Sequence, residues 1–431
     1  MAVTGMLSAA ALVLSACGPT VGGASGISQS GGGAIKIEYV HRLPDGSGAT
    51  PVAEIVKKWN DAHPDSQVTA TRFTGKASAL MTKLESDVKN NSAPCLAQVG
   101  YGEAPGLFVK NLLEDVSGEA AKYKDNYTAA YSQMSVGGKM VGLPQDTGPL
   151  VYLYNEAEFN ALGIAVPTTF DELLEAAKKA AAQGKYILNF EPDEAGDWLS
   201  AQAAAAGAVW YSTVDNKWKV NTTDEKTQSV AKFWQDVLDA QAALTNKRAD
   251  SAYEQALTSG SLIGNIAPAW EIGNALDKLD GTPYEGQWRV AKLPTFGGAK
   301  LTGPDGGSGV AVMKGCQHKA EAMEFANWFN TQVADLASHG LLPAAKDAVA
   351  TPEKTLRQFG NQDVYQVLTE ANGELPSDWG YIPGFSTVTP KMEEKADEVA
   401  AGSAKVADIF TVAEETSKQT LKESGLPVAD G

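Results

Sequence analysis

The stretch GKMVGLPQDTGPLVYLYN, residues 138–155, decides the fold predicted for this chain. Its pattern predicts extended backbone throughout, and it is much longer than an ordinary strand of about 5–6 residues. An extended segment of this length is typical of a chain that leaves one folded lobe and enters another. The segment therefore predicts a crossing between two lobes.

The residues before the crossing predict alternating strands and helices. Residues 34–40 and 67–73 each alternate in polarity like a strand, and a helix begins between them at Pro51. A third strand is expected over residues 93–99. The apolar residues of the helix recur at i, i+3, i+4 and i+7: Val52, Ile55, Val56 and Trp59. This alternation predicts an α/β lobe with a mainly parallel sheet.

The residues after the crossing predict the second lobe. Thr169 and Glu172 are spaced as a capping box at the start of a helix, and Gly184 marks its end. A similar helix over residues 322–329 follows a strand over residues 310–313. A chain of 431 residues, 43% of them hydrophobic, is long enough for two cores but not for three.

Charge and motifs exclude several classes of function. The formal net charge of -17, with no local basic patch, argues against nucleic acid, anionic membrane surfaces and phosphorylated ligands. The chain has no G-x-S-x-G elbow, HExxH zinc motif, P-loop or G-x-G-x-x-G fingerprint. The four histidines lack metal-ligand spacing: His41, His63, His318 and His339. We therefore expect no catalysis, no metal and no cofactor.

The N-terminus predicts export. The apolar run over residues 6–16 is too short for a membrane span of about 20 residues but suits a signal peptide, predicted over residues 1–16. The sequence around Cys17 resembles the bacterial lipobox, which implies cleavage before this cysteine and its lipidation. The rest of residues 17–33 is rich in Gly and Ser and predicts a flexible tether. The alternative is a fortuitous apolar N-terminus with a buried cysteine.

Three motifs give the chain a family resemblance. Residues 138–155 are similar to a G-K-x-Y-G-L-P crossover, residues 167–173 to P-x-T-W-D-E-L, and residues 264–270 to a G-x-x-A-M/P-x-W strand. In this order they resemble the extracellular solute-binding proteins of carbohydrate ABC transporters, the family that includes maltose-binding protein. The resemblance covers nearly the whole chain after residue 34.

The resemblance implies a two-lobe, type II periplasmic-binding-protein-like fold. The N-terminal lobe would comprise residues 34–146 plus 307–345, and the C-terminal lobe residues 147–306 plus 346–431. Cys95 and Cys316 would then share the first lobe, where a disulfide would not block hinge motion. The alternative is two separate buried thiols. The protein would be a monomeric lipoprotein on the outer face of the bacterial cell membrane, working with the permease subunits of an ABC importer.

Aromatic candidates for the ligand site follow from sugar chemistry. Rings cover the apolar faces of a sugar, and planar polar side chains bind its hydroxyls. Trp270 is the leading candidate, beside Glu271 at the end of an apolar strand. The other aromatic candidates are Tyr101 after the third strand, Trp198, and Trp379 and Tyr381 in a turn-rich loop. For each of them, core packing or an ordinary turn is the alternative.

Polar candidates lie at strand ends, at the crossing or beside the aromatic candidates. In open α/β sheets, ligands bind at the carboxyl edge of the strands. The polar candidates are His41, Asp45, Glu103, Asp146, Asp197, Glu271 and Ser308. Together the candidates predict capture of an oligosaccharide. A peptide, a polyamine or another non-sugar solute is the alternative, and a glycoside hydrolase, which needs a carboxylate pair across one bond, is a weaker one.

Overall fold

The computed structural model describes residues 34–429 except residues 45, 47 and 299. The predicted signal peptide, tether and lipidated Cys17 lie outside the described residues, as does Asp45. Within the described part of the chain, no helix is long and apolar enough to cross a membrane.

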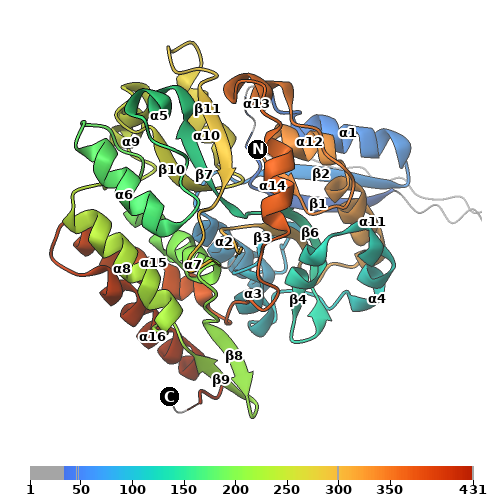
Figure 1. The fold of residues 1–431 in the computed structure, drawn as a ribbon. Coiled ribbons are helices and arrows are strands. Elements are labelled where there is room, and N and C mark those ends of the chain that lie inside the picture. The colour runs from blue at the N-terminus through green and yellow to red at the C-terminus, as the bar shows by residue number, and fades with distance from the viewer. Residues whose placement is uncertain (1–33, 45, 47, 299, 430–431) are drawn as a thin grey trace, which may run out of the picture.

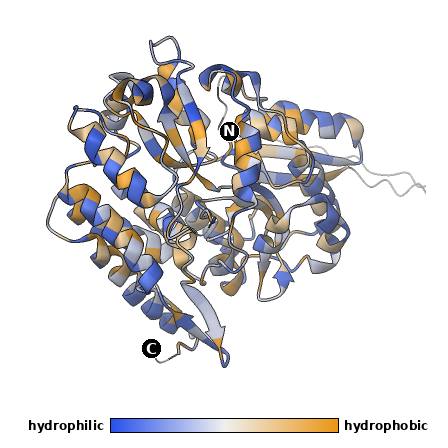
Figure 2. Ribbon diagram, in the orientation of Figure 1, coloured by the Kyte–Doolittle hydropathy of each residue, from blue (hydrophilic) through white to orange (hydrophobic). Residues whose placement is uncertain are grey.

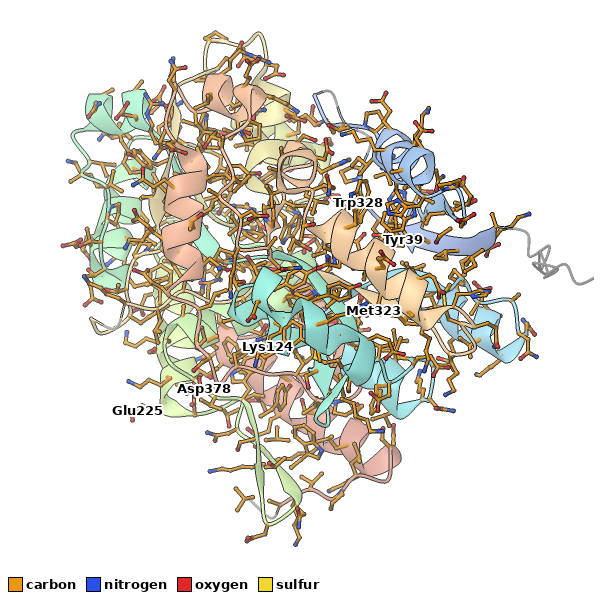
Figure 3. The ribbon with its side chains drawn as sticks, turned by 90° about the vertical axis from the view of Figure 1, so that its right-hand side faces the viewer. Tyr39, Lys124, Glu225, Met323, Trp328 and Asp378 are labelled. Carbon is orange, nitrogen blue, oxygen red and sulfur yellow. A yellow bond between two sulfur atoms is a disulfide. The ribbon has the colours of Figure 1, made fainter. Side chains whose placement is uncertain are left out.

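The described residues form a large six-stranded sheet in the order β13-β6-β12-β3-β1-β2. In Figure 1 it occupies the right half of the molecule. Helix α11 packs near this sheet: the rings of Tyr39 in β1 and Phe325 in α11 are 6.0 Å apart. Figure 3 shows Tyr39 near Met323 and Trp328 of the same helix. The strands are β1 (Ile35–His41), β2 (Ser66–Arg72), β3 (Leu96–Gly100), β6 (Gly142–Thr147), β12 (Ser308–Val312) and β13 (Leu342–Pro343).

A smaller sheet of order β10-β7-β11 lies in the other half of the described structure. Its strands are β10 (Gly264–Pro268), β7 (Leu150–Asn155) and β11 (Trp288–Lys292). Strand β7 is buried on both faces, because Leu150 and Tyr152 pack into one core and Val151 and Leu153 into another. The small sheet is therefore the centre of its half.

The remaining elements surround these sheets, and Figure 2 shows hydrophilic residues interleaved with hydrophobic ones along the outer helices. The helices are α1 (Val52–Ala62), α2 (Ala77–Lys89), α3 (Ala104–Val109), α4 (Ser117–Ala120), α5 (Glu156–Leu162), α6 (Phe170–Ala181), α7 (Ala195–Ala205), α8 (Glu225–Asp239), α9 (Ser251–Thr258), α10 (Ile272–Leu276), α11 (Lys319–Asn330), α12 (Val333–Ser338), α13 (Glu353–Gln358), α14 (Val364–Asn372), α15 (Phe385–Ala400) and α16 (Val406–Glu423). Short hairpins are formed by β4 (Ser135–Val136) with β5 (Lys139–Met140) and by β8 (Tyr211–Val214) with β9 (Lys217–Val220).

The α/β class is confirmed, but the prediction of mainly parallel sheets is wrong in detail. Strands β1, β2 and β3 pair in parallel, as the alternating pattern indicated. In contrast, β12 runs antiparallel to β3 and β6, and β7 runs antiparallel to β10 and β11. The physical reason is that a strand's hydrophobic pattern does not encode its direction. Direction depends on the long connections that bring β10, β11 and β12 to their sheets.

Two extended segments cross between the sheets side by side. Gly148 and Pro149 join β6 to β7, and Asp305 lies on the returning segment between β11 and β12. The Asp305 N–H donates to the Gly148 carbonyl over 2.7 Å. A Cβ atom on Gly148 would lie 2.0 Å from the Asp305 carbonyl oxygen, so this close approach requires glycine.

A disulfide joins Cys95 and Cys316, which are 221 residues apart in sequence. Cys95 precedes β3, Cys316 follows β12, and these two strands are neighbours in the large sheet. The Met313 N–H also donates to the Cys95 carbonyl, so the backbones meet beside the bridge. The disulfide therefore links two segments of one half.

We predict that replacing both cysteines, Cys95→Ser with Cys316→Ser, lowers the free energy of unfolding by about 2–5 kcal/mol. The loss comes mainly from the larger conformational entropy of the unfolded chain. Thermal and urea unfolding of the double variant would measure it, and reductant should destabilise only the unmodified protein. Equal unfolding midpoints for both proteins under oxidising conditions would contradict the prediction.

Candidate functional site

The large sheet gathers polar residues along one edge. Strands β1 and β3 are parallel, so they end at the same edge of the sheet, at His41 and Gly100. The antiparallel strand β12 begins at this edge. The register pairs Ser308 with both Gly100 and Asp146. Since β6 leaves this edge for the small sheet, the edge lies at the crossing between the halves.

A hydrogen-bonded chain connects these strand ends. One Asp146 carboxylate oxygen accepts from the Ser308 backbone N–H over 3.1 Å and from the Ser308 hydroxyl over 2.5 Å. The Gln98 side-chain amide donates to the same hydroxyl over 3.0 Å, and its oxygen accepts from the backbone N–H of Arg42 over 2.7 Å. Burial raises the pKa of Asp146 to about 6, although the hydrogen bond from Ser308 lowers it. Gln98 was not among the predicted site residues, although a polar side chain inside an apolar strand was a signal for it.

Tyr101 and Glu103 continue this edge. The Tyr101 hydroxyl donates to the Asp146 carbonyl over 2.7 Å. Gly307 approaches the Tyr101 ring so closely that a Cβ atom there would lie 2.6 Å from the ring. Glu103 accepts from the Gly100 N–H over 2.6 Å and lies 3.5 Å from the Arg42 guanidinium. Tyr101 therefore lies in the turn after β3, and its side chain is held between the two crossing segments.

The other half contributes buried and partly buried carboxylates around Arg248. The guanidinium donates to Glu194 over 2.5 Å and to Glu271 over 3.3 Å. Glu191 accepts a hydrogen bond of 2.6 Å from Asn265. Burial raises the pKa of Glu194 to about 8, with Arg248 lowering it, and burial raises the pKa of Glu191 well above its usual range. One arginine thus faces more carboxyl groups than it can neutralise.

Trp270 lies at the centre of this group. The Arg248 guanidinium carbon lies 4.6 Å from the centre of the Trp270 ring, a cation–π contact. The indole N–H donates to the Asp305 carbonyl over 3.0 Å. The ring is therefore oriented by Arg248 and by the returning crossing segment. The predictions included Trp270 and Glu271 but missed Arg248, Glu191, Glu194 and Asp305, which no motif marked.

The two groups of side chains face each other. Asp197 is exposed to solvent, but desolvation by the surrounding protein still raises its pKa; the Glu103 carboxylate raises it further, and Arg248 and Arg42 lower it. Asp197, from the small-sheet half, is thus within electrostatic reach of Glu103 and Arg42, from the large-sheet half. Burial also raises the pKa of Asp305 well above its usual range.

The loop before α15 touches the large-sheet half directly. A Cβ atom on Gly102 would lie 3.5 Å from the Tyr381 ring, and one on Gly106 would lie 3.2 Å from the Gly384 nitrogen. The Tyr381 hydroxyl donates to the Pro304 carbonyl over 3.4 Å. The structure thus brings Tyr381 to the meeting place of the halves.

Trp198 and Trp379, both predicted ligand contacts, lie in the core of the small-sheet half instead. Trp198 is fully buried, packs on Trp234 and donates to the Ile266 carbonyl over 3.1 Å. Trp379 is 5% exposed and packs on Trp210 with ring centres 5.6 Å apart. Trp198 is buried because helix α7 is covered on nearly all sides, which leaves this ring no surface that faces a cleft.

His41 is buried beside Tyr39, with ring centres 5.6 Å apart. The described residues contain no group of three or more His, Cys, Asp or Glu side chains placed to hold a metal ion. The arrangement offers hydrogen-bond donors, acceptors and one oriented indole ring. It can bind a polar ligand that has hydroxyl groups and an apolar face.

Comparison with known proteins gives the family. The model of the bacterial extracellular solute-binding protein family matches residues 45–335. The galacto-N-biose-/lacto-N-biose I-binding protein of an ABC transporter from Bifidobacterium longum, solved with lacto-N-biose, is 51% identical with a TM-score of 0.89. That similarity covers 92% of this chain and 100% of that one.

Two further relatives are more distant. A binding protein associated with an ABC transporter of B. animalis subsp. lactis Bl-04, solved with β-1,6-galactobiose, shares the fold with a TM-score of 0.78 at 23% identity, over 92% of this chain and 100% of that one. A probable ABC transporter-binding protein of Deinococcus radiodurans is 26% identical over 242 residues, which span about half of each chain, 52% of this one and 55% of that one. The resemblance inferred from the sequence motifs is confirmed: the chain belongs to the family of bacterial extracellular solute-binding proteins.

Proposed function

We propose that this protein captures an oligosaccharide between its two halves and delivers it to the permease of an ABC importer. The observation that carries the proposal is the Trp270 ring, which Arg248 and Asp305 hold in place among buried carboxyl groups. An oriented indole beside hydrogen-bonding groups is the arrangement that sugar recognition requires. The family is defined by solute binding, which agrees with the prediction that the chain is not an enzyme.

The ligand class is narrowed by the relative of 51% identity, which was solved with lacto-N-biose. We take a galactose-containing disaccharide of this kind as the first candidate ligand. The proposed lobes comprise residues 34–146 plus 307–345 and residues 147–306 plus 346–431, and they close on the ligand by a hinge motion at the crossing segments. Anchoring through Cys17 at the outer face of the cell membrane, and a monomeric state, belong to the same proposal.

A second candidate is a cationic solute such as a polyamine. The observation that favours it is the surplus of carboxyl groups around Arg248: the buried Glu191, Glu271 and Asp305 and the partly buried Glu194. Burial raises the pKa of each of these groups and so favours its neutral form, and a neutral carboxyl group can donate to a sugar hydroxyl as well as accept from it. The sugar therefore remains the main proposal.

A thermal-shift panel tests the ligand class. We expect lacto-N-biose to raise the melting temperature, because a ligand at 100 times its Kd adds about 2.7 kcal/mol to the free energy of unfolding. Maltose, a dipeptide and spermidine serve as comparisons in the same buffer. Stabilisation by spermidine alone would reject the sugar proposal in favour of the cationic solute.

Trp270→Ala should weaken sugar binding at least ten-fold, equivalent to about 1.4 kcal/mol, because it removes the ring that covers the apolar face of the sugar. Calorimetric titration with lacto-N-biose measures the loss. Trp218→Ala is the matched control: this tryptophan is also partly buried but lies in the β8–β9 hairpin, away from the site. Equal affinities for both variants would remove Trp270 from the site.

Stability should fall as pH rises from about 4 to about 6 at fixed ionic strength. Asp146 is buried and has a pKa of about 6 in the folded protein, raised first by burial, against about 3.9 in an unfolded chain. The folded state therefore holds more protons in this window, and stability is lost as Asp146 ionises. Asp146→Asn, which removes the buried carboxyl group, should flatten the slope of melting temperature against pH, whereas Asp378→Asn, at an exposed site, should leave it unchanged. A melting temperature that rises over this window would contradict this assignment.

A further inference from the structure

A cavity of about 250 Å³ lies between the two halves, apart from the residues described above. One wall is formed after β1 by Pro44, Gly46, Gly48 and Ala49, together with the end of α12. The opposite wall is α10 and α13, which come from the other half. Figure 1 shows α13 between α10 and α12 at the upper side of the molecule. The cavity is therefore shared by both halves.

Both walls are built by hydrogen bonds. On one side the two ring nitrogens of His339 lie 2.8 Å from the carbonyl oxygens of Pro44 and Thr50, and the Ser338 hydroxyl accepts from the Thr50 N–H. Pro44 and Thr50 are thereby fixed to the end of α12. On the other side, Asp277 accepts from Lys354 over 2.6 Å and from Gln358 over 2.7 Å.

The cavity adjoins the segment that carries Trp270. Gly273, in its wall, follows Trp270 by three residues. A Cβ atom on Gly340, also in the wall, would lie 3.6 Å from the Trp270 carbonyl oxygen. Of the predicted site residues that the structure describes, none lines the cavity. It is thus a separate space directly beside the candidate sugar site.

The lining suits a neutral, hydroxyl-rich group. Asp277 and Glu353 balance Lys354 and Arg357, so the lining carries little net charge from these residues. Carboxylate, amide, hydroxyl and guanidinium groups together can donate to and accept from hydroxyls. A volume of about 250 Å³ falls just below the roughly 300–1,000 Å³ of pockets for drug-sized ligands. It therefore suits one sugar unit rather than a whole oligosaccharide.

We propose that this cavity is an extension subsite, which takes one further sugar unit joined to the disaccharide at Trp270. The proposal rests on the proposed function, because it places the added unit next to a ligand already bound. Since each half supplies one wall, an occupant contacts both halves and favours their closed arrangement. The subsite makes the protein prefer ligands that are longer than a disaccharide by one unit.

The test compares lacto-N-biose with two trisaccharides that extend it by one hexose, one at each end, by calorimetric titration. We expect one of the trisaccharides to bind about ten-fold more tightly than lacto-N-biose, from two or three added hydrogen bonds. The other trisaccharide should show no such gain, because the cavity lies on one side of Trp270.

Gly273→Leu closes the cavity. A Cβ atom at Gly273 meets no atom within 4 Å, so a larger side chain enters open space, and in helix α10 it replaces a poor helix former. We expect the variant to bind lacto-N-biose within two-fold of the unmodified protein but to lose the ten-fold gain for the trisaccharide. Gly273→Ala, which fills less space, should keep most of that gain. Gly118→Leu is the matched control, because it lies in α4 with the same open surroundings and does not line the cavity.

The arms of the experiment separate the two proposals. If lacto-N-biose binds but neither trisaccharide binds more tightly, the subsite is rejected and the proposed function stands. If Gly273→Leu weakens lacto-N-biose and the trisaccharide equally, the cavity has no selective role and the subsite is also rejected. If none of the three sugars binds, the proposed function fails and the subsite fails with it.

Discussion

The contact between the two crossing segments is the constraint on which the rest of the structure depends. Gly148 has no side chain, so the Asp305 carbonyl can lie where a Cβ atom would otherwise be. The backbone N–H of Asp305 donates to the Gly148 carbonyl, and the backbone carbonyl of Asp305 accepts from the Trp270 indole. One residue of the crossing therefore fixes both the spacing of the halves and the edge of the candidate stacking ring.

This arrangement couples ligand contact to the relative position of the halves. Tyr101 is tied to Asp146 on one crossing segment and packs against Gly307 on the other. A change in the angle between the segments must move Tyr101 and Trp270 together, because both are bonded to the crossing backbone. Binding energy at these rings is then available to stabilise one arrangement of the halves.

The parts of the fold that sequence could predict are those set by local signals. Thr169 accepts from the Glu172 N–H at the start of α6, as the capping-box spacing predicted. Strand direction in the small sheet could not be predicted, because β7 pairs with strands more than a hundred residues away. The candidate site divides in the same way. Trp270 and Asp146 follow from their motifs, whereas Arg248 is brought to Trp270 only by tertiary packing. Asp197 and Trp198 are adjacent in sequence, yet helix α7 turns them about 100° apart, into the site and into the core respectively.

The disulfide has a mechanical consequence. It closes a covalent ring that begins before β3, passes through the whole small sheet and returns after β12. A pulling force applied between residues 34 and 429 travels through the sulfur atoms and bypasses all the chain between Cys95 and Cys316. The small sheet and the Arg248 cluster are thus shielded from tension, and a stretched molecule could lengthen only through the chain outside the ring.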